Sequence, residues 1–176
     1  MKKQGFTLIE LMVVIVIMGI LAAVAVPKLF GMIAKSKASE VGPAAGTYVK
    51  LQDAFIAETG TYYGSWNKIG YTAPGQTIAG TKTSATGSTP NFTYSQVGTY
   101  SDDETATVPQ AGSGAQVWKA ANRLKLNDCP AAENWNIKLE AGGSAAGAVK
   151  YTAYYTDDAA KSACSPLTAA FENIGK

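Results

Sequence analysis

The sequence predicts an α+β fold in which one long, bent N-terminal α-helix packs on an antiparallel sheet of about four strands. An almost uninterrupted apolar run at residues 6–26 predicts the first part of the helix. Apolar side chains at helical spacing extend this helix to about residue 59. Apolar side chains that alternate with polar ones between residues 92 and 155 predict strands, so the sheet is confined to the C-terminal part of the chain.

The apolar run at residues 6–26 is long enough to cross a membrane. Its side chains are almost all apolar, and Glu10 is its one charged residue. As a helix the run would measure about 30 Å, the thickness of a bilayer core. Because Lys2 and Lys3 lie directly before it, we expect the N-terminus to stay in the cytoplasm and the rest of the chain to face outward.

Glu10 is the residue in this run that most needs an explanation, because an unpaired carboxylate inside a membrane span costs several kcal/mol. Cleavage between Gly5 and Phe6 would create an α-amino group one helical turn from Glu10. In a bundle of identical helices staggered by about one turn, the carboxylate of one subunit would meet the ammonium of its neighbour. Such a buried pair would fix the axial register of the helices.

Three simpler interpretations of this segment compete. An ordinary secretory signal peptide is suggested by Ala23-Val24-Ala25, which resembles a cleavage site, but the apolar run is longer than a usual signal core. A plain membrane anchor gives no reason for Glu10. A buried core helix is disfavoured by the length of the run and by its apolar character on all sides.

The helical pattern continues beyond Pro27 as an amphipathic segment. Gly60 is a candidate C-terminal cap, so we expect one bent helix from Phe6 to about Thr59, roughly 80 Å long. Its second half should lie on a sheet. The apolar positions are Leu29, Phe30, Ile33 and Ala34 before an interruption at Gly42-Pro43, which either ends or bends the helix, and Tyr48, Leu51 and Phe55 after it.

The strand signals follow a Gly/Ser/Thr-rich loop at residues 76–90. The segment 116–126 fits a helix or a strand, and we favour a strand because a sheet needs about four strands to cover the helix. The Gly/Ala loop near residue 145 predicts that the last two strands form a hairpin. The other candidate strands are Phe92 to Tyr94 with Val97, then Trp135, Ile137 and Leu139, and then Val149, Tyr151, Ala153 and Tyr155.

The composition excludes several classes of function. The chain has no histidine, which removes histidine-based acid–base catalysis and metal ligation. Loss of Lys2 and Lys3 would leave 13 of the 15 basic residues against 13 acidic ones, so nothing favours nucleic-acid binding. The sequence also contains no nucleophile–base pair and no phosphate loop. We therefore expect a protein that is not an enzyme, with no catalytic site, cofactor or metal.

Two further features lie in the part of the chain that would be exported. Cys129 and Cys164 are the two cysteines, and in an exported chain such a pair predicts a disulfide, with two buried free thiols as the alternative. The bridge would hold the C-terminal segment 156–176, which shows little periodicity. The acidic runs 102–104 and 157–158 are candidate calcium ligands, but neither has a recognised ligand spacing, and we interpret both as solvated turns.

The run Lys-Lys-Gln-Gly-Phe-Thr-Leu-Ile-Glu-Leu at residues 2–11 resembles the class III signal sequence of type IV pilins and type II secretion pseudopilins. The resemblance covers about the first 55 residues. It implies that a prepilin peptidase removes a leader, residues 1–5, by cutting after Gly5, and N-methylates Phe6. It also implies that Glu10 is needed for assembly, and that the helix bends at Gly19 and Pro27, which match family positions.

The same resemblance implies a pilin fold in which two parts of the chain have different roles. Residues 6–27 would form the transmembrane and filament-core half of the helix, and residues 28–176 the globular pilin domain. The chain would be a single-pass inner-membrane precursor that the pilus assembly machinery polymerises into an extracellular helical homo-oligomer, for adhesion or twitching motility. A cysteine-bounded C-terminal loop favours a type IV pilin over a periplasmic pseudopilin. A helix-anchored surface-binding module is a further alternative.

Overall fold

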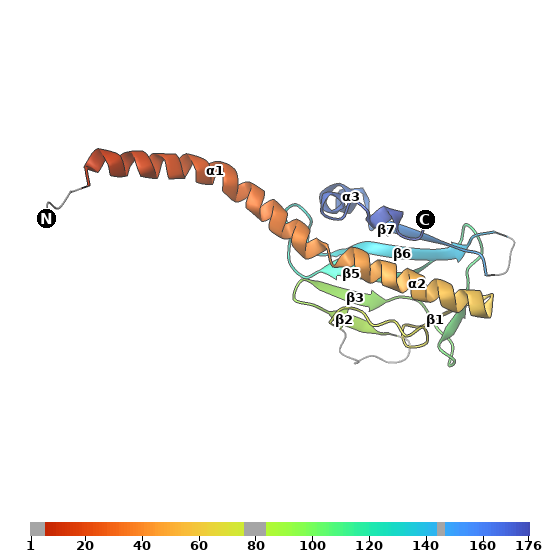
Figure 1. Cartoon of the computed structure of the whole chain (residues 1–176). Helices are drawn as coiled ribbons and strands as arrows, with labels where there is room; N and C mark the ends of the chain where they lie inside the picture. The colour runs from red at the N-terminus through yellow and green to blue at the C-terminus, as the bar shows by residue number, and fades with distance from the viewer. Residues whose placement is uncertain (1–5, 76–83, 144–146) are drawn as a thin grey trace.

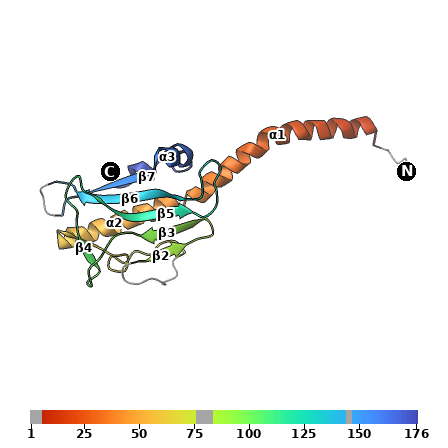
Figure 2. The same cartoon turned by 180° about the vertical axis from the view of Figure 1, so that it is seen from behind.

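The computed structural model describes residues 6–75, 84–143 and 147–176, and it shows a helix that protrudes from a globular domain (Figure 1). The N-terminal part of the helix extends away from the remainder of the chain, and its C-terminal part lies across the sheet (Figures 1 and 2). Both views place the C-terminus on the globular domain. This is the α+β arrangement that the sequence predicts.

Two consecutive helical segments, α1 (Leu8–Ala38) and α2 (Val41–Thr59), form the long helix. It begins at Leu8, slightly later than expected, because Thr7 is extended and acts as its N-cap. At the interruption, Ser39 and Glu40 keep right-handed helical backbone angles. The chain therefore continues from α1 into α2 without a loop between them. Pro43 explains the interruption, since it has no N–H to donate to the Ser39 carbonyl and its ring crowds that oxygen.

The end of α2 follows the sequence prediction. Gly60 has a φ of 77°, and its N–H donates to the Ile56 carbonyl at 2.7 Å. A left-handed residue at this position satisfies a carbonyl that would otherwise lack a partner, and glycine adopts it without a steric penalty.

The main sheet has five antiparallel strands in the order β2-β3-β5-β6-β7. Four of them correspond to the predicted strands, the ambiguous segment is the strand β5, and β6 and β7 form the expected hairpin. The short edge strand β2 and the separate pair β1–β4 were not predicted. The strands are β1 (Tyr62–Gly64), β2 (Thr86–Ser88), β3 (Phe92–Gln96), β4 (Thr105–Thr107), β5 (Ala115–Asn122), β6 (Glu133–Ala141) and β7 (Val149–Tyr155).

The core lies between α2 and one face of this sheet. The α2 side chains Tyr48 and Ile56 are fully buried, and so are Trp118 on β5 and Trp135 on β6. Alternation places Trp135, Ile137 and Leu139 on the same face of β6, as the sequence predicts. Because α2 covers that face, it is fixed to the sheet, whereas the first part of α1 has no sheet beneath it (Figure 1).

The C-terminal segment corrects an expectation. It was expected to have little regular structure, but it contains the helix α3 (Asp158–Cys164) and the 3₁₀ turns η1 (Ser165–Leu167) and η2 (Phe171–Asn173). The Asp157 side chain caps α3 by accepting a hydrogen bond from the Ala160 N–H at 2.7 Å. The second acidic run, residues 157–158, is therefore a helix start rather than a simple solvated turn.

Candidate functional site

The N-terminal part of α1 is the candidate functional site, because it exposes a large apolar surface. Its large apolar side chains are exposed from Phe6, at 77%, to Ile33. Burial begins at Ala34, of which 4% is exposed. The apolar residues surround the helix instead of forming one stripe, so no single face is directed at the globular domain.

By length and composition α1 can cross a membrane, and it lies near the N-terminus. An apolar surface of this extent is unstable in water and marks a membrane or protein contact. The described part of the chain offers it no cover, since α1 is exposed up to Ile33. Residues 6–33 therefore present a surface suited to contact with lipid or with another protein.

Glu10 lies in the first turn of α1, where Thr7 holds its carboxylate. Glu10 Oε2 accepts hydrogen bonds from the Thr7 N–H at 2.8 Å and from Thr7 Oγ1 at 2.7 Å. The Glu10 N–H donates to Thr7 Oγ1 at 3.3 Å. These reciprocal bonds form a capping box.

The sequence prediction did not include Thr7, although a threonine followed three residues later by glutamate is a recognisable signature of a helix start. The capping box uses only one oxygen of Glu10. Over residues 6–75, 84–143 and 147–176, Glu10 Oε1 has no hydrogen-bond partner. The helix start thus orients the carboxylate and leaves one oxygen available to another group. The other predicted cleavage residue, Gly5, lies outside the described residues.

The two predicted bend positions differ in what the structure shows. Pro27 lies inside α1, where it cannot donate a hydrogen bond to the Ala23 carbonyl, and α1 curves along its length (Figure 1). A Cβ at Gly19 would meet nothing within 4 Å, so no contact inside the subunit requires glycine there. The predicted role of Gly19 in bending the helix stays a prediction.

The predicted disulfide between Cys129 and Cys164 is present, with a Cα–Cα distance of 4.8 Å. It joins the connection between β5 and β6 to the end of α3. Both cysteines are fully buried. Trp135 Nε1 also donates to Thr168 Oγ1 at 2.8 Å, so the C-terminal segment is attached to the sheet by more than the disulfide.

The acidic run 102–104 has a structural role in this fold. Glu104 has a φ of 60°, and its carboxylate accepts a hydrogen bond from Ser65 Oγ at 2.7 Å. Asp102 and Asp103 are exposed, as expected for a solvated turn. The described residues contain no group of three or more carboxylates or cysteines placed to hold a metal ion.

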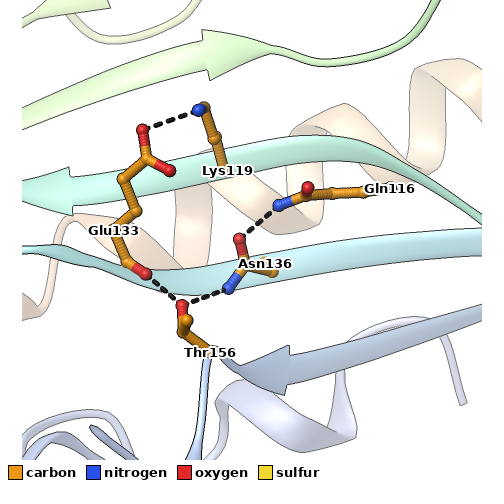
Figure 3. Close-up of polar contacts among 5 residues, drawn as sticks. All are labelled: Gln116, Lys119, Glu133, Asn136 and Thr156. Atoms are coloured by element: carbon orange, nitrogen blue, oxygen red, sulfur yellow. Dashed lines mark hydrogen bonds and ion pairs between the residues drawn. The ribbon is translucent and has the colours of Figure 1, made fainter.

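The face of the sheet opposite α2 carries a polar network (Figure 3). Gln116 on β5 donates to the Asn136 side chain on β6, and Asn136 Nδ2 donates to Thr156 Oγ1 at 2.9 Å. Lys119 and Glu133 form an ion pair at 2.6 Å beside it. These bonds connect β5, β6 and the residue that follows β7 across the outer face, and we assign them a structural role.

The comparisons with known proteins cover only part of the chain. A family model described as the prokaryotic N-terminal methylation motif matches residues 1–26. The type IV major pilin protein PilA of Myxococcus xanthus (strain DK1622) is 41% identical over 70 residues, which make up 40% of this chain and 32% of the relative. The type IV major fimbrial protein FimA of Dichelobacter nodosus is 56% identical over 39 residues, 22% of this chain and 25% of the relative.

A third relative is the fimbrial protein EcpC of Eikenella corrodens, which is 42% identical over 60 residues, 34% of this chain and 39% of the relative. The chain thus spans between 25% and 39% of the length of these three relatives. No solved structure matches it significantly. The resemblance to type IV pilins that residues 2–11 indicate is confirmed by the family model and by these relatives.

Proposed function

We propose that this chain is a structural subunit that polymerises into a type IV pilus, used for surface adhesion or twitching motility. The observation that carries the proposal is the exposed apolar helix from Phe6 to Ile33, attached to a globular domain with its own core. Identical helices packed side by side would cover each other's apolar surface while the globular domains face outward. The fold and the pilin relatives support a structural role, and we propose no enzymatic activity and no cofactor.

The proposal includes the maturation of a membrane precursor. A prepilin peptidase cuts between Gly5 and Phe6 and N-methylates Phe6, which separates the leader 1–5 from the mature chain. Residues 6–27 hold the precursor in the inner membrane and later form the filament core, and residues 28–176 form the outer, globular part. The match of the N-terminal methylation motif to residues 1–26 supports processing and methylation at this end of the chain.

Glu10 has a specific role in the proposed assembly. Its Oε1 atom accepts a hydrogen bond from the α-amino group of Phe6 in a neighbouring subunit, while Oε2 stays in the capping box with Thr7. In an apolar filament core this pair sets the axial offset between helices, because any other offset leaves a buried charge unpaired.

The proposal is tested by shearing intact cells and examining the released material by electron microscopy and mass spectrometry. We expect long filaments whose main component is this chain, with a mature N-terminus at Phe6 that carries one added methyl group. A chain found only in the cell envelope would favour the alternative, a pseudopilin that forms a short periplasmic piston. A chain that matures at Val26, without its apolar helix, would contradict the proposal.

A further inference from the structure

Loop 123–128, the first part of the connection between β5 and β6, lies beside α1 where the helix leaves the globular domain (Figures 1 and 2). It carries Leu124, of which 63% is exposed. Beyond residue 33, Leu124 and Tyr62 are the only strongly exposed large apolar side chains in the parts of the chain that the structure describes. Leu124 lies between Arg123 and Lys125, which are both exposed.

The fold holds this loop in place. The buried Asn122 side chain donates hydrogen bonds to the Leu124 carbonyl at 3.0 Å and to the Pro130 carbonyl at 2.8 Å. Leu126 and Cys129 exchange two backbone hydrogen bonds of 3.0 Å, and Cys129 is bridged to α3. The exposure of Leu124 is therefore a property of a fixed loop and not of a loose one.

The loop and α1 together line a groove of about 370 Å³. Phe30, Ile33 and Lys37 come from α1, and Lys125 and Leu126 come from the loop. The groove is thus lined by apolar side chains together with one lysine from α1 and one from the loop.

The groove lies at the level where the membrane span ends. The proposed membrane span, residues 6–27, ends three residues before Phe30, so Phe30 lies about 5 Å beyond the end of the span along the helix. Because Phe30 shares the groove with Lys125, the loop stands at the height of the outer headgroups when α1 is inserted. Lys37 lies about 10 Å further along the helix, within reach of the same layer for a long side chain.

The charge of this surface is positive. Lys28, Lys35, Lys37 and Lys125 form no ion pair with any described residue. The acidic residues nearby are Asp128, which accepts a hydrogen bond from Asn127, and Glu40, which accepts hydrogen bonds from Thr89 and Tyr94. Glu40 is thus held by groups of the globular domain.

We propose that loop 123–128 and the adjoining part of α1 form a docking surface for anionic phospholipids on the outer face of the inner membrane. Leu124 enters the boundary between headgroups and acyl chains, and Lys37 and Lys125 contact the phosphates. This surface positions the globular domain of the inserted subunit before assembly. The inference rests on the membrane-inserted stage of the proposed function.

The test uses the mature full-length chain in vesicles, with a fluorophore on the cysteine of a Leu124→Cys variant. Tyr62→Cys is the matched control, because Tyr62 is the other exposed large apolar residue. With phosphatidylglycerol vesicles that carry headgroup-attached quenchers, we expect strong quenching at position 124 and little at position 62. Equal quenching at the two positions overturns the inference.

Lysine variants test the choice of lipid. Replacement of Lys37 or Lys125 by glutamine should lower the preference for phosphatidylglycerol over phosphatidylcholine about fivefold each. Lys50→Gln, further along the helix on α2, should leave the preference unchanged. An equal effect of all three variants contradicts a specific docking surface.

Two further outcomes separate the alternatives. A probe at position 124 that stays unquenched in vesicles and becomes shielded only in filaments shows that a second copy of the chain covers the loop, and it overturns the lipid assignment. Failure of the full chain to stay with the vesicles after an alkaline wash contradicts the proposed function itself. Retention without quenching at position 124 contradicts this inference alone.

Discussion

Glu10 forms one interaction within the subunit and, as we propose, a second one between subunits. Mutations can separate the effects of the two. Within the subunit its carboxylate completes a capping box with Thr7, and between subunits we propose that it pairs with the α-amino group of Phe6. Loss of a cap costs about 1 kcal/mol, whereas loss of one partner of a buried ion pair costs about 3 to 5 kcal/mol. The second effect should therefore dominate assembly.

We predict that Glu10→Val leaves membrane insertion and leader cleavage intact but abolishes most filament formation. Thr7→Ala is the matched control, because it removes the cap and keeps the charge, and it should reduce filament yield only slightly. Sheared filaments and cleaved envelope protein would be measured in cells that lack the wild-type chain. Normal filaments from Glu10→Val, or equal losses from both variants, would show that the pairing argument is wrong.

The disulfide gives a second prediction at the residue scale. Cys129 and Cys164 are 35 residues apart, and closing a loop of this size stabilises the folded state by about 4 kcal/mol in the chain-entropy model. We expect non-reducing peptide mapping to find the bridge in mature protein. A Cys129→Ser/Cys164→Ser variant should melt at a clearly lower temperature, and an unchanged melt would remove the structural role of the bond.

At the scale of single elements, the length and regularity of each strand decided whether the sequence revealed it. Alternation is visible over the seven to nine residues of β6 and β7, but a strand of three residues, such as β1 or β2, is too short to show a period. In β5 the register shifts between Gln116 and Trp118 and between Ala120 and Ala121. Such bulges interrupt the alternation, which explains why this segment also fitted a helix.

Helix α3 was missed for a related reason. It spans seven residues, which is fewer than two full helical turns, so its apolar residues show no clear periodicity. Its sequence signal is the cap residue Asp157, but two consecutive aspartates are equally common in turns. Buried Ala160 and the bridged Cys164 hold α3 against the sheet, and these contacts cannot be read from the local sequence.

The cap of α3 allows a matched pair of variants. We predict that Asp157→Ala lowers the free energy of unfolding by about 1 kcal/mol, because the Ala160 N–H loses its acceptor. Asp158→Ala should have a smaller effect, since Asp158 is exposed and contributes mainly through its favourable charge near the helix start. Chemical denaturation of both variants measures the difference, and an equal loss would contradict the capping role.

At the scale of the whole molecule, the sequence predicted the part of the candidate site that depends on composition. An apolar run with one carboxylate can be recognised without a structure, and Glu10, Gly19 and Pro27 were identified as candidate site residues in this way. The exposure of Leu124 and the groove beside Lys125 were not visible, because they depend on where the connection between β5 and β6 lies relative to α1. Proximity between distant segments is set by the fold.

The division between the free and the packed parts of the helix gives the last prediction. Removal of residues 1–27 deletes only exposed helical surface from the described part of the chain, whereas Ala34, Ala38 and Val41 belong to the core of the globular domain. We therefore expect the chain from Lys28 onward to be a soluble monomer with a single cooperative thermal transition.

A second truncation that begins at Pro43 is the control for this division. It also removes Ala34, Ala38 and Val41, and the loss of these buried side chains from the core should cost several kcal/mol. Circular dichroism and size-exclusion chromatography would compare the two proteins. If the longer protein aggregates or melts without cooperativity, the first half of α1 stabilises the subunit itself. If both proteins melt alike, the core does not need the buried residues that precede Pro43, and the boundary between the two parts of the helix lies further along the chain.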